Sequence, residues 1–268
     1  MEVEEKSTRI KRPSFLVKNK LAIVIGASQG IGRTISISLA EEGAEVILSS
    51  RRKEVLQEVD KEIKKLGGKS SILPLDVRDV SNIHQFASQI QERVKFRNTS
   101  LILVNSAGVD LTKPVLDVTE ADWDAVHDTH LKGLFFICQA IGQLMIELGY
   151  GKIINISSTW SFSTDPGKSV YSAAKAGVSH LTSALATEWG ALGVRVNAIA
   201  PTATLTPPTI LGLDKNKNRA DRLLAHIPMG RFATPEDLIG AVIFLASEAS
   251  DFINGQTIFV DGGWRAKG

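Results

Sequence analysis

The sequence predicts an α/β protein made of a single domain, a doubly wound parallel sheet of about seven strands with helices on both faces. Apolar runs alternate with helical patterns along most of the 268 residues. These runs are continuously apolar, as expected for strands that helices cover on both sides. A glycine-rich turn at residues 26–32 follows the first run, and the chain is long enough to bury one large core.

The elements follow from periodicity and from turn residues. We expect strands at residues 21–25, 44–50, 71–75, 101–104, 152–156, 194–200 and 256–260. Helical patterns separate them, including a long helical region over 120–148 and a helix over about 171–191. Residues 201–228, which hold four prolines and a charged run, are expected to be irregular.

Composition excludes several classes of protein. The formal net charge of +2 is too small to favour a nucleic acid or an anionic membrane as a partner. No apolar run approaches the roughly 20 residues of a membrane span, and Cys138 is the only cysteine, so no disulfide or cysteine metal cluster is expected. We predict no metal site, a flexible tail over 1–18, a domain over 19–268, and a cytoplasmic protein.

The glycine-rich turn is a candidate dinucleotide site. Gly26, Gly30 and Gly32 lie between the first predicted strand and a helix, where the backbone can approach a ligand closely. The first N–H groups of that helix are free to bind a phosphate. A plain strand–helix turn is the alternative, but its position after the first strand favours the dinucleotide site.

The end of the second predicted strand bears on the choice of cofactor. An NAD-binding protein normally has an acidic residue there, bonded to the ribose. This chain has Ser50, followed by Arg51 and Arg52. Two guanidinium groups suit a 2′-phosphate, so NADP(H) is predicted over NAD(H). The alternative is a pair of solvated arginines that open a helix.

Tyr171, Lys175 and Ser158 form a candidate catalytic centre. Residues four apart share one face of a helix, so the Lys175 ammonium would lie near the Tyr171 phenol and lower its pKa. Tyr171 could then act as a general acid or base toward a carbonyl or alcohol oxygen. Ser158, just beyond the fifth strand, could bind the same oxygen. A half-buried tyrosine and a solvated lysine are the alternative.

With these residues the sequence resembles the short-chain dehydrogenase/reductase family, in its 3-oxoacyl-reductase-like branch. The matching motifs are Gly26-Ala27-Ser28-Gln29-Gly30-Ile31-Gly32, Asp76-Val77, Asn105-Ser106-Ala107-Gly108, Ser158, Tyr171 with Lys175, Asn197 to Pro201, and Asp261-Gly262-Gly263. The resemblance implies a Rossmann-type sheet, a Ser-Tyr-Lys centre, a small-molecule substrate and a homotetramer. The expected cofactor-binding residues are Gly26, Ser28, Gln29, Gly30, Ile31, Gly32, Ser50, Arg51, Arg52, Asp76, Val77, Asn105, Ala107, Gly108, Tyr171, Lys175, Pro201, Thr204 and Thr206.

His130 departs from the family pattern, which usually has a fourth catalytic residue, Asn, at this position. An imidazole could join proton supply and make it depend on pH near its ordinary pKa of about 6.5. Equally, His130 could simply pack within its helix.

Substrate residues are expected after Ser158 and in the irregular stretch. Besides Ser158, the candidates are Trp160, Phe162, Leu205 and Ile210. Their apolar side chains favour a ketone with apolar or aromatic surface. A role in the core or in a subunit interface is the alternative. No arginine precedes Arg219 in this stretch, which disfavours recognition of a small acid by a fixed guanidinium.

Other functions remain open. Relatives that reduce 3-oxoacyl groups on acyl carrier protein have arginines where this chain has Gly149 and Leu192, which weakens that alternative. Oxidation of a sugar or polyol uses the same catalytic residues. A non-catalytic NADP(H)-binding regulator would be a different class, and the intact Ser158, Tyr171 and Lys175 argue against it.

Overall fold

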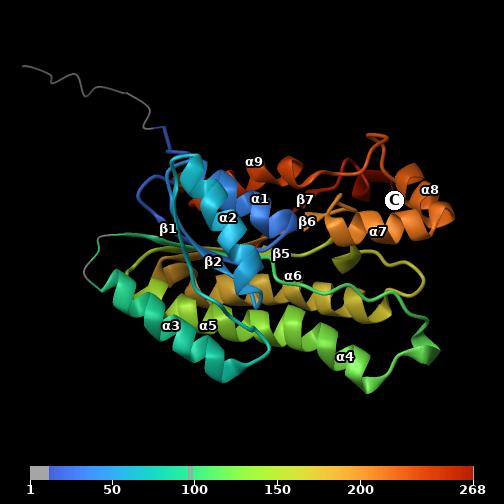
Figure 1. Cartoon of the computed structure of the whole chain (residues 1–268), viewed down its shortest axis with the longest axis horizontal. Helices are drawn as coiled ribbons and strands as arrows, with labels where there is room; N and C mark the ends of the chain where they lie inside the picture. The colour runs from blue at the N-terminus through green and yellow to red at the C-terminus, as the bar shows by residue number, and fades with distance from the viewer. Residues whose placement is uncertain (1–11, 96, 98, 268) are drawn as a thin grey trace, which may run out of the picture.

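The predicted α/β sheet is confirmed in a computed structural model that describes residues 12–95, 97 and 99–267 (Figure 1). Seven parallel strands lie in the order β3-β2-β1-β4-β5-β6-β7. They span Leu21–Ile25 (β1), Glu45–Ser49 (β2), Lys69–Ile72 (β3), Leu101–Asn105 (β4), Gly151–Ile156 (β5), Val194–Pro201 (β6) and Thr257–Val260 (β7). The order reverses between β1 and β4, which places a binding crevice at their carboxyl ends.

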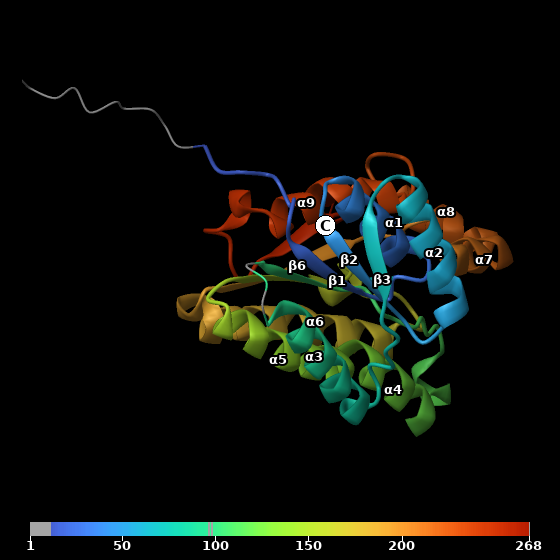
Figure 2. The same cartoon turned by 60° about the vertical axis from the view of Figure 1, so that its left-hand side comes forward.

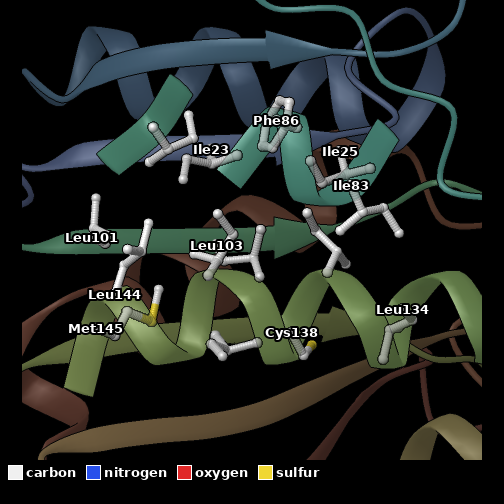
Figure 3. Close-up of a cluster of buried hydrophobic side chains, with 14 of the residues drawn as sticks. Ile23, Ile25, Ile83, Phe86, Leu101, Leu103, Leu134, Cys138, Leu144 and Met145 are labelled. Carbon is white, nitrogen blue, oxygen red and sulfur yellow. The ribbon is translucent and has the colours of Figure 1, made fainter. Parts of the chain in front are cut away.

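Helices cover both faces of the sheet (Figure 2). One layer holds α1 (Gly30–Glu41), α2 (Lys53–Lys65) and α9 (Ile239–Ala246), and the other holds α3 (Val80–Val94), α4 (Glu120–His127), α5 (Gly133–Glu147) and α6 (Ser169–Trp189). Each layer has its own apolar core. In Figure 3, Ile23 and Leu103 of the sheet meet Phe86 of α3 and Cys138 of α5.

Residues 201–228 are more regular than expected. They contain α7 (Pro207–Lys215) and α8 (Lys217–Ala225). The expectation of an irregular stretch was therefore wrong, because a proline at the first helical position starts α7 instead of breaking it. Both helices lie at one end of the molecule, near the end of the chain (Figure 1).

Two other expectations need adjustment. The third strand runs over Lys69–Ile72, not 71–75, because β2 pairs only with those residues. The helical region over 120–148 contains a π-helical turn at Asp128–Lys132 between α4 and α5. Such turns insert one residue and occur often at functional sites.

The segment before β1 packs on the body of the protein where it is described. The carbonyl of Ser14 accepts a hydrogen bond from the N–H of Ala249 at 3.0 Å, and Val17 is fully buried. Residues 1–11 of the predicted tail lie outside the described residues. Within the described ranges, no helix has both the length and the apolar character needed to cross a membrane.

Candidate active site

A cleft of about 650 Å³ lies at the carboxyl end of the sheet. Ile25 pairs with Asn105, and Asn105 pairs with Asn155. The loops that follow β1, β4 and β5 therefore leave the sheet at one level and meet around the cleft. Among the described residues, no group of His, Cys, Asp and Glu is placed to hold a metal ion.

The glycine turn forms one end of this cleft. Gly26 has a φ of +87°, and a Cβ there would lie 2.6 Å from the backbone nitrogen of Ala107. A Cβ on Gly32 would lie 2.2 Å from the Gly26 carbonyl oxygen, so only glycine lets α1 start this close to β1. No side chain caps the first turn of α1. The backbone here fits the phosphates of a dinucleotide.

Two arginines follow β2 and line the cleft beside Ser50. Arg52 donates hydrogen bonds to Gln29 Oε1 at 2.8 Å and to Ser28 Oγ at 3.2 Å. Its guanidinium thus lies over the glycine turn. Arg51 is exposed and has no hydrogen bond or ion pair within the described part of the chain.

A third arginine, Arg78, lines the cleft together with Arg51 and Arg52. The sequence did not predict this residue for the site. Arg78 donates to both carboxylate oxygens of Asp76, with Nη2 at 2.6 Å from Oδ2. These hydrogen bonds lower the pKa of Asp76 and keep it ionised. Arg78, Asp76 and Val77 all line the cleft, so three guanidinium groups and one carboxylate lie at the end of the cleft that follows β2 and β3.

The predicted catalytic residues come together at the other end. Ser158 lies just after β5, and Tyr171 and Lys175 lie on the first turns of α6. The Ser158 hydroxyl lies close enough to the Tyr171 phenol to oppose the rise of its pKa, and it accepts a hydrogen bond from the N–H of Trp160 at 3.1 Å. Lys175 Nζ is 5.7 Å from the centre of the Tyr171 ring and donates to the carbonyl of Ile156 at 2.7 Å. All three line the cleft.

The pKa values in this centre differ from the expectation. Burial and the charge of Asp110 raise the pKa of Tyr171, while the nearby Ser158 hydroxyl opposes the rise. Burial also lowers the pKa of Lys175 to about 7. The expected lowering of the Tyr171 pKa by Lys175 is absent here, because burial disfavours the charged form of both groups.

His130 lies in the π-helical turn and is buried against the loop after β4. Its Nε2 is 2.7 Å from the carbonyl oxygen of Val109 and 3.1 Å from the Val109 nitrogen. Nδ1 is buried and has no hydrogen-bond partner among the residues that the structure describes. Burial, with a smaller effect of Lys175, lowers the pKa of His130 to about 3, so the ring is neutral near pH 7. The ring also meets Tyr171 edge to face, with centroids 5.3 Å apart.

Asn105 and Gly32 do not line the cleft, although both were predicted as cofactor residues. Asn105 is buried and donates to Asn155 Oδ1 at 2.9 Å and to Cys138 Sγ at 3.2 Å. It joins β4 to β5, whereas Gly32 allows close packing of α1. Burial raises the pKa of Cys138 to about 12, which makes this thiol inert. The remaining predicted cofactor residues line the cleft: Gly26, Ser28, Gln29, Gly30, Ile31, Ser50, Arg51, Arg52, Asp76, Val77, Ala107, Gly108, Tyr171, Lys175, Pro201, Thr204 and Thr206.

The residues predicted to bind substrate lie only partly in the cleft. Trp160 lines the cleft, while Phe162 lines a neighbouring cavity of about 510 Å³. Leu205 and Ile210 line neither. Their places are taken by Leu213 of α7, Leu223 of α8 and Trp264 near the end of the chain, which pack together in one apolar cluster with Trp160.

Besides Arg78, three charged residues that line the cleft were not predicted: Lys168, Asp110 and Arg219. Lys168 is 3% exposed and forms an ion pair with Asp110, and its Nζ is 5.2 Å from the centre of the Tyr171 ring. Lys168 precedes Tyr171 by three positions, a spacing that could have suggested proximity. Arg219 belongs to the charged run, but its position in the cleft depends on α7 and α8.

Comparison with known proteins agrees with this geometry. A family model described as enoyl-(acyl carrier protein) reductase matches residues 26–265. The chain belongs to the short-chain dehydrogenase/reductase family and is an oxidoreductase that acts on CH–OH groups.

Its relatives differ in substrate. Gluconate 5-dehydrogenase of Gluconobacter oxydans is 37% identical over 249 residues, which are 93% of this chain and 96% of that protein. The 3-oxoacyl-acyl-carrier-protein reductase of Thermotoga maritima is 36% identical over 247 residues, which are 92% and 98%. The structure of a gluconate 5-dehydrogenase from Burkholderia cenocepacia in complex with NADP and tartrate has a TM-score of 0.88 and 33% identity, and covers 94% of this chain and 97% of its own.

Proposed function

We propose that this protein is a carbonyl reductase that prefers NADP(H) to NAD(H) and reversibly reduces a ketone with apolar or aromatic surface. The arrangement of Ser158, Tyr171 and Lys175 beside a cleft that begins at the glycine turn carries this proposal. Bound NADPH would supply the hydride for reduction.

The protein's own residues would hold the substrate oxygen and supply its proton. The Tyr171 hydroxyl donates a proton to the carbonyl oxygen as negative charge develops there. The Ser158 hydroxyl, which lies near Tyr171, directs its single O–H to the same oxygen. Because burial keeps Tyr171 protonated, its resting state is that of a general acid, which suits reduction. In the opposite direction, Tyr171 accepts the proton of the alcohol.

The preference for NADP(H) rests on charge at the end of the cleft that follows β2 and β3, the proposed adenosine end. Arg51, Arg52 and Arg78 line it, and its one carboxylate, Asp76, is already engaged by Arg78. A 2′-phosphate carries negative charge and several acceptor oxygens, so it gains charge-assisted hydrogen bonds that a ribose hydroxyl cannot match. Among the described side chains, Arg51 donates no hydrogen bond and its only interaction is the attraction of its charge to Asp76, and it is therefore the primary proposed ligand.

The apolar part of the substrate would pack on Trp160, Leu213, Leu223 and Trp264. Two of these residues lie on α7 and α8, which would form the outer wall of the substrate site. A 3-oxoacyl thioester or a polyol remains a candidate substrate, because relatives of this chain include a gluconate dehydrogenase and a 3-oxoacyl reductase.

We also propose that the protein forms a homotetramer, as the family resemblance implies. Phe135 on α5 is 38% exposed and Phe252 is fully exposed. Large apolar side chains of this kind are commonly buried by association. Light scattering after gel filtration would give the mass directly, and a single species with the mass of one 29.0 kDa chain would contradict the tetramer.

The test follows NADPH absorbance with a panel of aryl ketones, diketones, keto sugars and acetoacetyl-CoA, and repeats it with NADH. We expect ketone-dependent oxidation of NADPH that is faster than that of NADH. Faster turnover with NADH would contradict the assigned preference. Tight binding of NADPH without turnover of any ketone, or of any alcohol in reverse, would favour the non-catalytic regulator.

A further inference from the structure

A charged cluster lies in the cleft on the side of Tyr171 that faces α8. It consists of Lys168, Asp110, Asp165, Arg219 and Arg222, of which Lys168, Asp110 and Arg219 line the cleft. The ammonium of Lys168 is buried beside the Tyr171 ring and carries an ion pair with Asp110. Burying a charged ammonium group lowers the stability of a folded protein, so Lys168 is retained here despite that cost.

Arg219 has unused hydrogen-bonding capacity. Its Nε is 3.5 Å from Asp165 Oδ2, a long contact, and its side chain is 20% exposed. Asp165 is satisfied by Arg222, whose Nη2 lies 3.1 and 3.2 Å from the two carboxylate oxygens. Neither terminal nitrogen of Arg219 donates a hydrogen bond to any part of the chain that is described. The fork of this guanidinium is therefore open to a ligand in the cleft.

The cluster carries an excess of one positive charge, since three cations face the carboxylates of Asp110 and Asp165. Burial lowers the pKa of Lys168, Asp110 opposes this shift, and the charge of Arg219 lowers the pKa further by a smaller amount, so Lys168 and Arg219 lie near each other. Both cations line the same cleft, and an anion bound beside them would reduce their mutual repulsion. A monoanion matches the excess charge, and a planar carboxylate matches the guanidinium fork.

We propose that this cluster is a carboxylate-binding subsite, and that the substrate is an oxo acid or hydroxy acid whose carboxylate lies on Arg219 and Lys168. The inference rests on the proposed function and names its substrate class. The reacting carbonyl lies at Tyr171 and Ser158, and the apolar body lies on Trp160 and Trp264. In reduction the carbonyl carbon gains the hydride and its oxygen gains the proton of Tyr171, while the carboxylate is unchanged. Because α8 brings Arg219 into the cleft, the sequence argument against acid recognition is weakened.

The experiment compares oxo acids with their neutral esters in the full-length protein. Levulinate is paired with methyl levulinate, and benzoylacetate with ethyl benzoylacetate. We expect the NADPH-dependent kcat/KM of each acid to exceed that of its ester. Since a hydrogen bond to a charged group contributes about 1.5–3 kcal/mol, Arg219→Gln should lower kcat/KM for the acids roughly 10- to 100-fold and change that of the esters less than about 3-fold.

Two further variants sharpen the result. Lys217→Gln removes an exposed charge from the same helix, α8, and is expected to leave both substrates unchanged. Lys168→Met would leave Asp110 unpaired, so it is made together with Asp110→Asn, and this double variant should lose the preference for acids. Circular dichroism checks that each variant is folded.

Measuring levulinate binding distinguishes the proposed carboxylate subsite from the proposed reductase activity. Trp160 and Trp264 line the cleft, so tryptophan fluorescence reports levulinate binding without turnover. Weaker levulinate binding in Arg219→Gln than in Lys217→Gln supports the subsite even if no ketone is reduced. If esters and acids are reduced equally well and Arg219→Gln lowers both equally, the carboxylate subsite is wrong while the reductase stands. Equal levulinate binding in both variants also overturns the subsite.

Discussion

The Nε2 atom of His130 lies 2.7 Å from the carbonyl oxygen of Val109. This contact ties the π-helical turn to the loop after β4, the loop that also carries Asp110. A neutral ring that donates Nε2–H to this carbonyl has its other nitrogen, Nδ1, buried with no hydrogen-bond partner in the described part of the chain. Burial lowers the pKa of His130 to about 3. The imidazole therefore holds a loop of the active site in place and carries no charge near neutral pH.

His130 should add no ionisation to the pH–rate profile near pH 6.5. The profile of kcat/KM between pH 5.5 and 8 is expected to have the same shape in the wild type and in His130→Asn, because the buried ring stays neutral throughout this range. Initial rates at ketone concentrations well below KM, with saturating NADPH, measure it. An inflection near pH 6.5 that is present in the wild type and absent in His130→Asn would show that the imidazole supplies protons.

Replacement of Tyr171 by Phe should lower kcat by about 10²- to 10⁴-fold, the usual contribution of a positioned general acid. Binding of NADPH should change little, because the ring and its contacts remain. The chain contains two tyrosines, which provides a matched control. Tyr150→Phe removes a hydroxyl that hydrogen-bonds Asp251 at 2.8 Å, away from the cleft. Similar activity in the two variants would exclude Tyr171 as the acid.

Arg51→Ala should weaken NADPH binding and leave NADH binding almost unchanged. Loss of a charge-assisted hydrogen bond of about 1.5–3 kcal/mol predicts a roughly 10- to 100-fold rise in the KM for NADPH. Arg97→Ala is the control, since Arg97 pairs with Glu45 at the other end of β2. If Arg51→Ala raises the KM of NADPH and of NADH equally, the Arg51 guanidinium does not bind the 2′-phosphate.

The buried Lys175 should make stability depend on pH. Its folded pKa is about 7, whereas an unfolded lysine has a pKa of about 10.4. Between these values unfolding takes up a proton, so the free energy of unfolding rises with pH. Relative to Lys175→Met, the wild type should gain stability at up to about 1.4 kcal/mol per pH unit. Urea unfolding at pH 7 to 10 tests this, and parallel curves for the two proteins would refute it.

Gly32→Ala should destabilise the protein and abolish cofactor binding. The new methyl group would lie 2.2 Å from the carbonyl oxygen of Gly26, so α1 must move away from β1 and open the phosphate site. Gly240→Ala in α9 is the contrasting variant, because a Cβ there meets nothing within 4 Å. That change should stabilise the helix by up to about 1 kcal/mol. Thermal unfolding and NADPH titration would show both effects, and equal Tm shifts in the two variants would contradict the close-packing argument.

The sequence alone was sufficient for the sheet, the glycine turn and the Ser158, Tyr171 and Lys175 constellation. Buried parallel strands must be apolar throughout, as Leu21–Ile25 is. Tyr171 and Lys175 are neighbours through helical spacing alone. Such local rules do not depend on how distant parts of the chain pack.

The tertiary structure decided which other residues line the cleft around Ser158, Tyr171 and Lys175. The sequence predicted Leu205 and Ile210 as substrate residues, but the packing of α7 and α8 brings Leu213, Leu223 and Arg219 into the cleft instead. Likewise, the pKa of Tyr171 depends on burial and on Asp110, a residue 61 positions earlier in the chain. Charge, burial and the shape of a cleft arise from contacts between distant segments, and for this reason only the folded chain revealed the charged cluster beside Tyr171.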